Sequence, residues 1–178
     1  MNRYVAFLRA INVGGKHLVK MDRLRELFEA LKLENVETFI ASGNVIFDSR
    51  SNDASALELQ IEKRLHTALG FEVATFVRST DEVGAVAKYR PFSDHDIEQC
   101  ALMVGFLKSP PTAEARKKVE KFGTEIDQFH VHQRELYWLC RTKIGESDFT
   151  GARLEKTLGT SATMRNVTTV RKLAAKFR

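Results

Sequence analysis

The sequence predicts an α+β protein made of a tandem of two ferredoxin-like subdomains of the βαββαβ type, with a helical C-terminal tail. Two observations support this prediction. Short apolar strands and amphipathic helices alternate over residues 1–79 in the order β-α-β-β-α-β, which is the ferredoxin-like order. The same theme begins again at residue 100, as a repeat of element order without an obvious repeat of residues. A chain of 178 residues is long enough for two such subdomains.

The first half of the chain opens with a buried strand over residues 3–9. Apolar residues recur at i, i+3, i+4 and i+7 from Leu24, which predicts an amphipathic helix beginning at Met21. Two short strands follow at residues 36–40 and 44–49, joined by a turn containing Ser-Gly-Asn, whose glycine and asparagine tolerate positive φ.

A second helix completes this half of the chain. Asp53 is its expected N-terminal cap and Gly70 its expected C-terminal stop. Alternation over residues 71–78 predicts a further strand, and residues 80–88 predict a short helix.

The second half begins after a linker at residues 89–96. Residues 100–107 predict a strand, Thr112 is placed to cap a helix, and residues 125–140 predict a hairpin. The remaining residues are interpreted as the helical tail. The expected subdomains are therefore residues 1–88 and 96–178.

Composition indicates the class and setting of the protein. Its 43% hydrophobic and 29% charged residues are ordinary for a soluble globular chain, and no apolar run is long enough to cross a bilayer, so no membrane association is expected. The N-terminus does not resemble a signal peptide. Two cysteines, Cys100 and Cys140, are too few for a disulfide framework and favour the cytoplasm.

The excess positive charge lies in one region. Residues 141–178 carry nine Lys/Arg and three Asp/Glu, a net charge of +6, whereas residues 1–140 carry a net charge of −1. A basic region attracts phosphates, nucleic acid or acidic partners. The alternative interpretation is a solvated basic helix that improves solubility.

The sequence "GGK" at residues 14–16 is not a nucleotide-hydrolysing P-loop. That motif requires a glycine at position 10 and Ser or Thr at position 17, where this chain has Ala10 and His17. The helix also begins about five residues after Lys16, so its N-terminus is in the wrong place to hold a phosphate.

Topology nevertheless suggests a small-anion site. The first and second strands of a ferredoxin-like unit run parallel, so the loops that follow them lie at the same end of the sheet. The predicted ligand-binding residues there are Arg9, Asn12, Gly14, Gly15, Lys16, Ser42, Gly43 and Asn44. The alternative is that each turn only reverses the chain and that both asparagines bond to backbone.

The chain resembles the family called domain of unknown function 1697. The resemblance rests on "YVAFLRAINVGGKHLVKMDRLRELFEAL", "VETFIASGNVIFDS" and "TSATMRNVTTVRKLAA", and with the intervening element order it covers essentially all 178 residues. The chain departs from typical members at Ala10, where they have glycine, at Ala41, where they have glutamine, and at Val167, where they have tryptophan. The resemblance implies the tandem fold, adds Arg165 and Asn166 to the candidate ligand site, and implies no settled activity.

Other motifs give weaker signals. His130 and His132 are two residues apart, a spacing that suits zinc, but no third ligand has a matching spacing, so no metal is predicted. Ser42 lacks a G-x-S-x-G pattern. Strand aromatics such as Phe7 and Phe76 are interpreted as core residues rather than base-stacking platforms.

The sequence is compatible with three candidate functions. The leading one is binding of a small anionic or phosphorylated ligand, with a nucleotide among the candidates, near the glycine loop, the Ser-Gly-Asn turn and the basic tail. The second is a nucleic-acid-binding module that uses the basic tail. The third is an enzyme acting on a phosphorylated or acyl substrate, which lacks a convincing nucleophile–base pair in the sequence. The ligand, any cofactor and the oligomeric state are left open.

Overall fold

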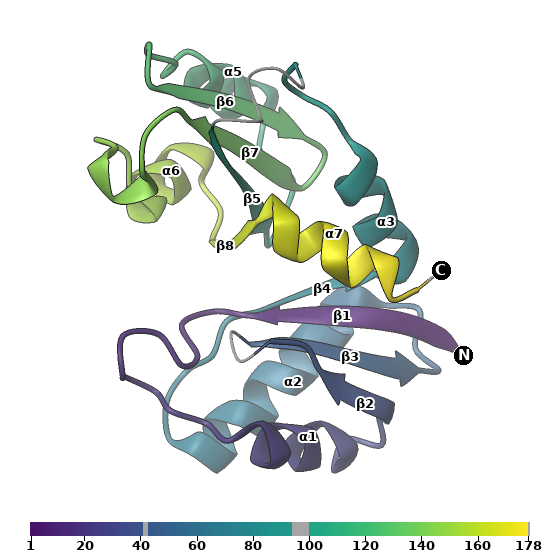
Figure 1. Cartoon of the computed structure of the whole chain (residues 1–178). Coiled ribbons are helices and arrows are strands. Elements are labelled where there is room, and N and C mark those ends of the chain that lie inside the picture. The colour runs from purple at the N-terminus through teal and green to yellow at the C-terminus, as the bar shows by residue number, and fades with distance from the viewer. Residues whose placement is uncertain (41–42, 94–99, 178) are drawn as a thin grey trace. The chain divides into compact units, whose positions relative to one another are not determined.

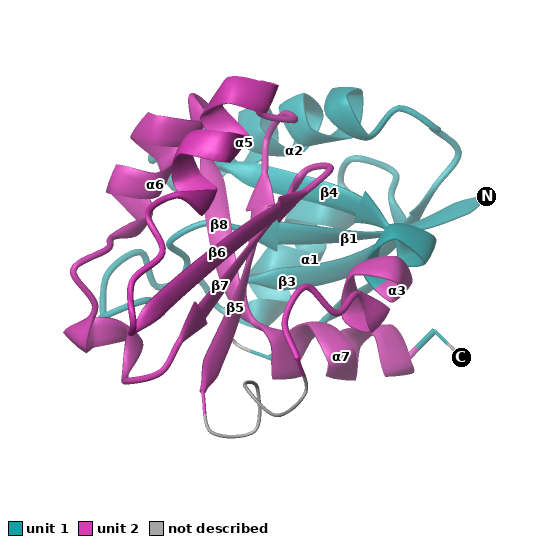
Figure 2. Ribbon diagram, turned by 90° about the horizontal axis from the view of Figure 1, so that it is seen from above, with its two compact units in different colours: residues 1–83, 177 teal, residues 84–176, 178 magenta. Residues whose placement is uncertain are grey.

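The computed structural model describes residues 1–40, 43–93 and 100–177. These residues form two compact units, unit 1 with residues 1–83 and 177, and unit 2 with residues 84–176 (Figure 2).

Unit 1 contains a four-stranded sheet with the order β2-β3-β1-β4 (Figure 1). Its strands are β1 (Asn2–Leu8), β2 (Glu34–Thr38), β3 (Asn44–Ser49) and β4 (Thr75–Ser79). Every neighbouring pair is antiparallel, and Val5 of β1 lies between Ile46 of β3 and Arg78 of β4. This order confirms the predicted ferredoxin-like arrangement.

Two helices form the core of unit 1 with one face of this sheet. They are α1 (Met21–Glu29) and α2 (Ala54–Leu69). Leu24 and Phe28 of α1 and Ile61 of α2 pack with Ala6 and Phe47 of the sheet, and all five are fully buried. The apolar positions that predicted the helices are therefore the ones that face the core.

The ends of α2 follow from local chemistry. A carboxylate oxygen of Asp53 accepts a hydrogen bond of 3.0 Å from the backbone N–H of Ala56, which caps the first turn. Gly70 ends the helix with φ of 79°, a left-handed conformation that glycine adopts without strain. Both predicted boundaries are confirmed.

Carboxylates of α2 also protect the edge strand β4. Oε1 of Glu62 accepts a hydrogen bond of 2.8 Å from the N–H of Thr75, and Oε1 of Glu58 accepts one of 2.8 Å from the N–H of Val77. An edge strand with satisfied backbone donors is a poorer template for pairing with another chain.

Unit 2 repeats this topology. Its sheet has the order β6-β7-β5-β8, with β5 (Ala101–Leu107), β6 (Asp127–His132), β7 (Glu135–Cys140) and β8 (Ala162–Asn166). Val104 of β5 lies opposite Arg165 of β8, just as Val5 lies opposite Arg78 in unit 1. The predicted duplication of the fold is therefore present at the level of strand register.

The helices of unit 2 also pack against their sheet to form a hydrophobic core. Val119 of α5 (Ala113–Glu120) and Leu154 of α6 (Gly151–Leu158) pack with Trp138 of the sheet. Thr112 caps α5 as predicted, through a hydrogen bond from the N–H of Ala115. A short 3₁₀ helix, η1 (Ile144–Glu146), lies between β7 and α6.

Glutamates of unit 2 protect its edge strands in the same way. Oε1 of Glu120 in α5 accepts a hydrogen bond of 3.0 Å from the N–H of Val131 in β6, and Oε1 of Glu155 in α6 accepts one of 2.6 Å from the N–H of Ala162 in β8. Glu155 therefore matches the role of Glu62 in unit 1.

Helix α3 (Thr80–Lys88) follows β4 as predicted, and two other details correct the sequence interpretation. The basic tail is not helical throughout, because β8 separates α6 from α7 (Val167–Ala175), which is the helical C-terminal segment. The predicted strand at residues 71–78 begins only at Thr75, because its partner strand β1 ends at Leu8, which lies opposite Thr75. Within the described part of the chain, no helix is both long and apolar enough to span a membrane.

Candidate functional site

The glycine loop, residues 9–20, leaves the end of β1 and contains a tight turn at its tip (Figure 1, the purple segment after β1). The N–H of Lys16 donates a hydrogen bond of 3.1 Å to the carbonyl oxygen of Val13. Gly14 and Gly15 between them have φ of 59° and 74°, and positive φ at both central residues is the signature of a type I′ turn. The two glycines are therefore explained by the turn itself.

Asn12 holds the base of this turn. Its Oδ1 accepts a hydrogen bond of 2.7 Å from the N–H of Val19, and its Nδ2 donates one of 3.1 Å to the carbonyl oxygen of Val19. The side-chain amide thus ties the two arms of the loop together. Both polar atoms of the side chain bond to the backbone of the loop, as the alternative interpretation of Asn12 predicts.

Three non-glycine residues of the loop have left-handed backbones. Ala10, Asn12 and His17 have φ of 58°, 56° and 50°. An L-residue with a Cβ pays about 1–2 kcal/mol in this region, and asparagine is the most tolerant of the three. Position 10 is where typical members of the resembled family have glycine, and the positive φ explains that preference.

The loop and the turn before β3 meet at one end of the sheet. The N–H of Leu8 donates a hydrogen bond of 2.7 Å to the carbonyl oxygen of Gly43. Asn44 is 1% exposed, and its Nδ2 donates a hydrogen bond of 3.0 Å to the carbonyl oxygen of Phe39. Ser42, the remaining predicted residue of this turn, lies outside the described residues.

A groove of about 800 Å³ opens at the base of the glycine loop. It lies between the start of the loop, the outer face of α2 and the segment before β4. The N–H of Arg9 donates a hydrogen bond of 2.9 Å to the carbonyl oxygen of Ala74, and this bond joins the start of the loop to the segment before β4. The lining residues are Arg9, Ala10, Leu59, Glu62, Lys63, His66, Thr67, Glu72, Val73 and Ala74.

The groove combines cationic and apolar groups. Arg9, Lys63 and His66 are its basic side chains, and Leu59 contributes an apolar side chain that is 65% exposed. Of its two carboxylates, that of Glu62 is bound to the backbone of Thr75. The second carboxylate is that of Glu72, so the lining carries two carboxylates beside the formal charges of Arg9 and Lys63.

The structure brings only part of the predicted site to this groove. Arg9 lines it, whereas Asn12 and Asn44 bond to backbone and Lys16 is exposed at the tip of the loop. Sequence reasoning missed Leu59, Lys63 and His66, although their i, i+4, i+7 spacing on α2 puts them on one helix face away from the core.

The predicted residues Arg165 and Asn166 belong to unit 2. Nη1 of Arg165 donates to Oγ1 of Thr163 at 2.9 Å and to the carbonyl oxygen of Met164 at 2.8 Å. Burial lowers the pKa of Arg165 to about 10, so its guanidinium is still a cation at neutral pH. Asn166 caps α7, because its Oδ1 accepts a hydrogen bond of 2.8 Å from the N–H of Thr168.

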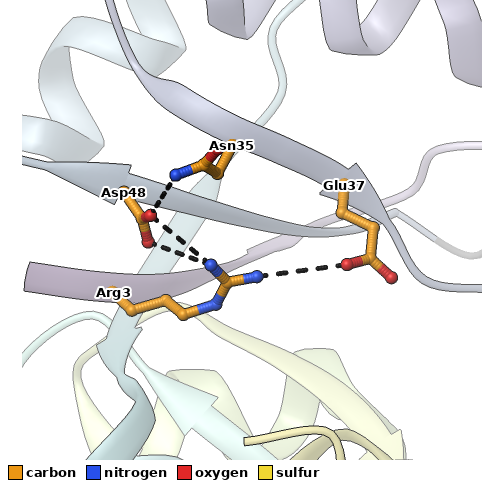
Figure 3. Close-up of polar contacts among 4 residues, drawn as sticks. All are labelled: Arg3, Asn35, Glu37 and Asp48. Carbon is orange, nitrogen blue, oxygen red and sulfur yellow. Dashed lines mark hydrogen bonds and ion pairs between the residues drawn. The ribbon is translucent and has the colours of Figure 1, made fainter.

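A second polar cluster in unit 1 has a structural explanation (Figure 3). Nη1 of Arg3 lies 3.2 Å from Oδ1 of Asp48, and Nη2 lies 4.0 Å from Oε2 of Glu37. Nδ2 of Asn35 donates a hydrogen bond of 2.7 Å to Oδ2 of Asp48. These contacts link β1, β2 and β3, so the guanidinium of Arg3 is paired with carboxylates of the same sheet.

The remaining motifs yield no metal or base-stacking site among residues 1–40, 43–93 and 100–177. No group of three metal-ligating side chains occurs in these ranges. The rings of Tyr4, Phe7, Phe47, Phe76 and Phe106 are at most 5% exposed and so are not free to stack on bases. Phe39, which follows β2, is half-buried, and a single ring does not make the platform on which two or three bases stack.

Fold and groove together define an α+β protein with two ferredoxin-like units. The model of the family described as "Protein of unknown function (DUF1697)" matches residues 1–137, and the chain belongs to this family. The chain is also similar to the solved structure of the conserved bacterial protein SP0830 from Streptococcus pneumoniae, with a TM-score of 0.76 and 23% identity over 99% of this chain and 98% of that one. At that identity the likeness shows the fold alone. No curated protein matches the chain.

Proposed function

We propose that unit 1 binds a small anionic ligand in the groove at the base of the glycine loop. One observation carries this proposal: the groove of about 800 Å³ gathers the basic side chains of Arg9, Lys63 and His66 beside the exposed side chain of Leu59. Pockets of about 300–1,000 Å³ are typical for small organic ligands. An isolated inorganic anion would leave most of this groove empty.

The chemistry of the lining narrows the ligand class. A phosphate or carboxylate group pairs with the guanidinium of Arg9 and the ammonium of Lys63. The apolar body of the same ligand lies against Leu59, the most exposed large aliphatic side chain of the groove. A nucleoside monophosphate has both parts, so we propose this class of ligand.

Isothermal titration calorimetry at low salt tests this proposal, with AMP and inorganic phosphate as the two probes. We expect AMP to bind more tightly than phosphate, and the substitutions R9A and K63A each to weaken AMP binding about tenfold or more, the cost of one charge-assisted hydrogen bond. K20A is the matched control, because Lys20 is exposed in unit 1 but does not line the groove. Equal affinities for R9A, K63A and K20A would refute the site.

A nucleic-acid-binding module is the second candidate function. The +6 charge of residues 141–178 favours it, with Lys156 of α6 and Lys172 of α7 exposed. The burial of the strand aromatics counts against a base-stacking sheet. Its test is fluorescence anisotropy with labelled single-stranded DNA and RNA, where binding must fall steeply with added salt. No binding at low salt would end this alternative.

We place the protein in the cytoplasm because Cys100 and Cys140 are both free thiols. Paired cysteines would be expected of a small exported protein. An enzymatic activity on a phosphorylated substrate is the weakest of the three functions, because no described residue of the groove forms a nucleophile–base pair with another.

A further inference from the structure

Tyr89 follows α3 directly and lies against β6 and β7 of unit 2. Its ring stacks on the imidazole of His132, with centroids 4.3 Å apart and an angle of 16° between the planes. The ring centroid of Tyr137 lies 5.1 Å from that of Tyr89. These two contacts fix the orientation of the phenol.

The hydroxyl of Tyr89 ends a chain of three polar side chains from three elements. Its oxygen lies 2.9 Å from Nε2 of His130 in β6. On the other side of that imidazole, Nδ1 lies 3.3 Å from Oε1 of Glu120 in α5. A phenol, an imidazole and a carboxylate therefore stand in line, in the manner of a nucleophile, its base and the group that orients the base.

The two contacts of His130 assign its tautomer. A lone pair on Nδ1 would face the carboxylate oxygen of Glu120, so the proton of the neutral ring belongs on Nδ1. Nε2 is then left as the acceptor for the Tyr89 hydroxyl. Glu120 is itself held in place, because Oε1 also accepts the N–H of Val131 at 3.0 Å.

The three residues are partly exposed to solvent. The side chains of His130 and Glu120 are 36% and 32% exposed, and Tyr89 is half-buried. The other two tyrosines, Tyr4 and Tyr137, are 5% and 1% exposed. Burial, the Glu135 carboxylate and Tyr89 raise the pKa of Tyr137 well above its usual range, so Tyr137 is a much poorer nucleophile.

We propose that Tyr89 is an activated nucleophile that accepts an acyl group from an activated acyl donor, with His130 as its general base. The phenol oxygen bonds to the carbonyl carbon while Nε2 of His130 takes the phenol proton. The bond from that carbon to the leaving group then breaks, and the leaving group receives the proton from His130. Glu120 is a positioning residue, which stabilises the imidazolium formed between these steps. The product is the O-acyl ester of Tyr89.

Acetylation by N-acetylimidazole tests the proposal on the full chain. This reagent acetylates phenols and releases imidazole, and mass spectrometry of proteolytic peptides gives the rate at each tyrosine. N-acetyltyrosinamide in the same solution supplies the rate of an unassisted phenol. We expect Tyr89 to react at least about tenfold faster than this reference. This threshold is modest, because general-base assistance usually gives a larger rate enhancement. A Tyr89 rate equal to or below the reference would overturn the proposal.

Two matched variants separate base catalysis from packing. H130F removes the base, and we expect the rate at Tyr89 to fall to that of N-acetyltyrosinamide or lower. H132F keeps an aromatic ring stacked on Tyr89 and is expected to retain the fast rate. A fast rate in H130F would contradict the role of His130. If H130F does not fold, the rate at Tyr89 of the wild-type protein, compared with that of N-acetyltyrosinamide, still tests the proposal.

Discussion

The backbone N–H of Leu8 donates a hydrogen bond of 2.7 Å to the carbonyl oxygen of Gly43. This bond joins the end of β1 to the turn before β3, so it fixes the position of the glycine loop that starts one residue later. The approach is close: a Cβ at position 43 would lie 3.1 Å from both Cβ and the carbonyl oxygen of Leu8. Gly43 also has φ of 77°, so two separate constraints require glycine here.

The substitution G43A is therefore expected to lower the free energy of unfolding by about 2–4 kcal/mol, from left-handed strain and from overpacking. G70A is the matched control, since Gly70 has φ of 79° but nothing within 4 Å of its added Cβ. G70A is expected to cost about 1 kcal/mol, the strain alone. Urea unfolding measures both, and equal losses would show that the contact with Leu8 relaxes freely.

Ala10 carries the opposite prediction. Its φ of 58° strains alanine but not glycine, so A10G is expected to stabilise unit 1 by about 1 kcal/mol despite the greater freedom of unfolded glycine. The same change at Ala85, exposed within α3, is expected to destabilise by about 0.5–1 kcal/mol. Thermal unfolding of both variants checks the difference in sign, and a destabilised A10G would mean that position 10 is not left-handed.

Asp127 in unit 2 supports a buried hydrogen-bond network. Its Oδ1 accepts the indole N–H of Trp138 at 2.7 Å, and its Oδ2 accepts the hydroxyl of Ser147 at 2.9 Å, while the residue itself is 2% exposed. D127A leaves the indole N–H buried without this acceptor, and we expect a loss of about 2–3 kcal/mol. S147A removes two hydrogen bonds of a half-buried hydroxyl, the one to Asp127 and the one that Oγ accepts from the N–H of Phe149 at 3.1 Å, and should cost about 1–2 kcal/mol. Chemical unfolding followed by Trp138 fluorescence orders the two, and equal costs would contradict this network.

Tyr137 predicts a loss of stability at alkaline pH. Its pKa is raised in the folded protein, so above the ordinary tyrosine value of 10.0 the unfolded chain releases a proton that the folded chain keeps. This contribution to stability is full below pH 10 and falls by about 1.4 kcal/mol per pH unit above it. Unfolding of Y137F between pH 9 and pH 11.5 is expected to show a shallower decline than wild type. Parallel curves, or native-state ionisation of Tyr137 in ultraviolet titration near pH 10, would contradict the assignment.

Most elements of the fold could be predicted, because the capping residues and apolar periods that define a helix or strand lie within one short segment of the sequence. Asp53 and Gly70 mark the ends of α2, and Thr112 marks the start of α5. Strand β8 escaped prediction, because its five residues include polar ones and lie between helical segments. Its strand conformation comes from pairing with β5, a contact distant in sequence.

The candidate site was only partly predictable, because it too depends on contacts between residues that are distant in the sequence. Gly14, Gly15 and Asn12 were recognised as loop residues, but their use in a type I′ turn and in the bond to Val19 depends on the closed loop. The groove joins Arg9 to Lys63 and His66, which are more than 50 positions apart in the sequence. No local pattern in the sequence indicates such a pairing.

The most direct test of the proposed function is to locate the ligand on the protein. Titration of ¹⁵N-labelled protein with AMP at low salt, followed by amide chemical shifts, reports every binding surface at once. We predict that the largest changes fall at residues 9–10, 63–67 and 72–74, and that R9A shifts their half-maximal change to about tenfold higher AMP or more, while K20A leaves it unchanged. Changes centred on residues 141–176, or no change at millimolar AMP, would contradict an anion-binding groove in unit 1.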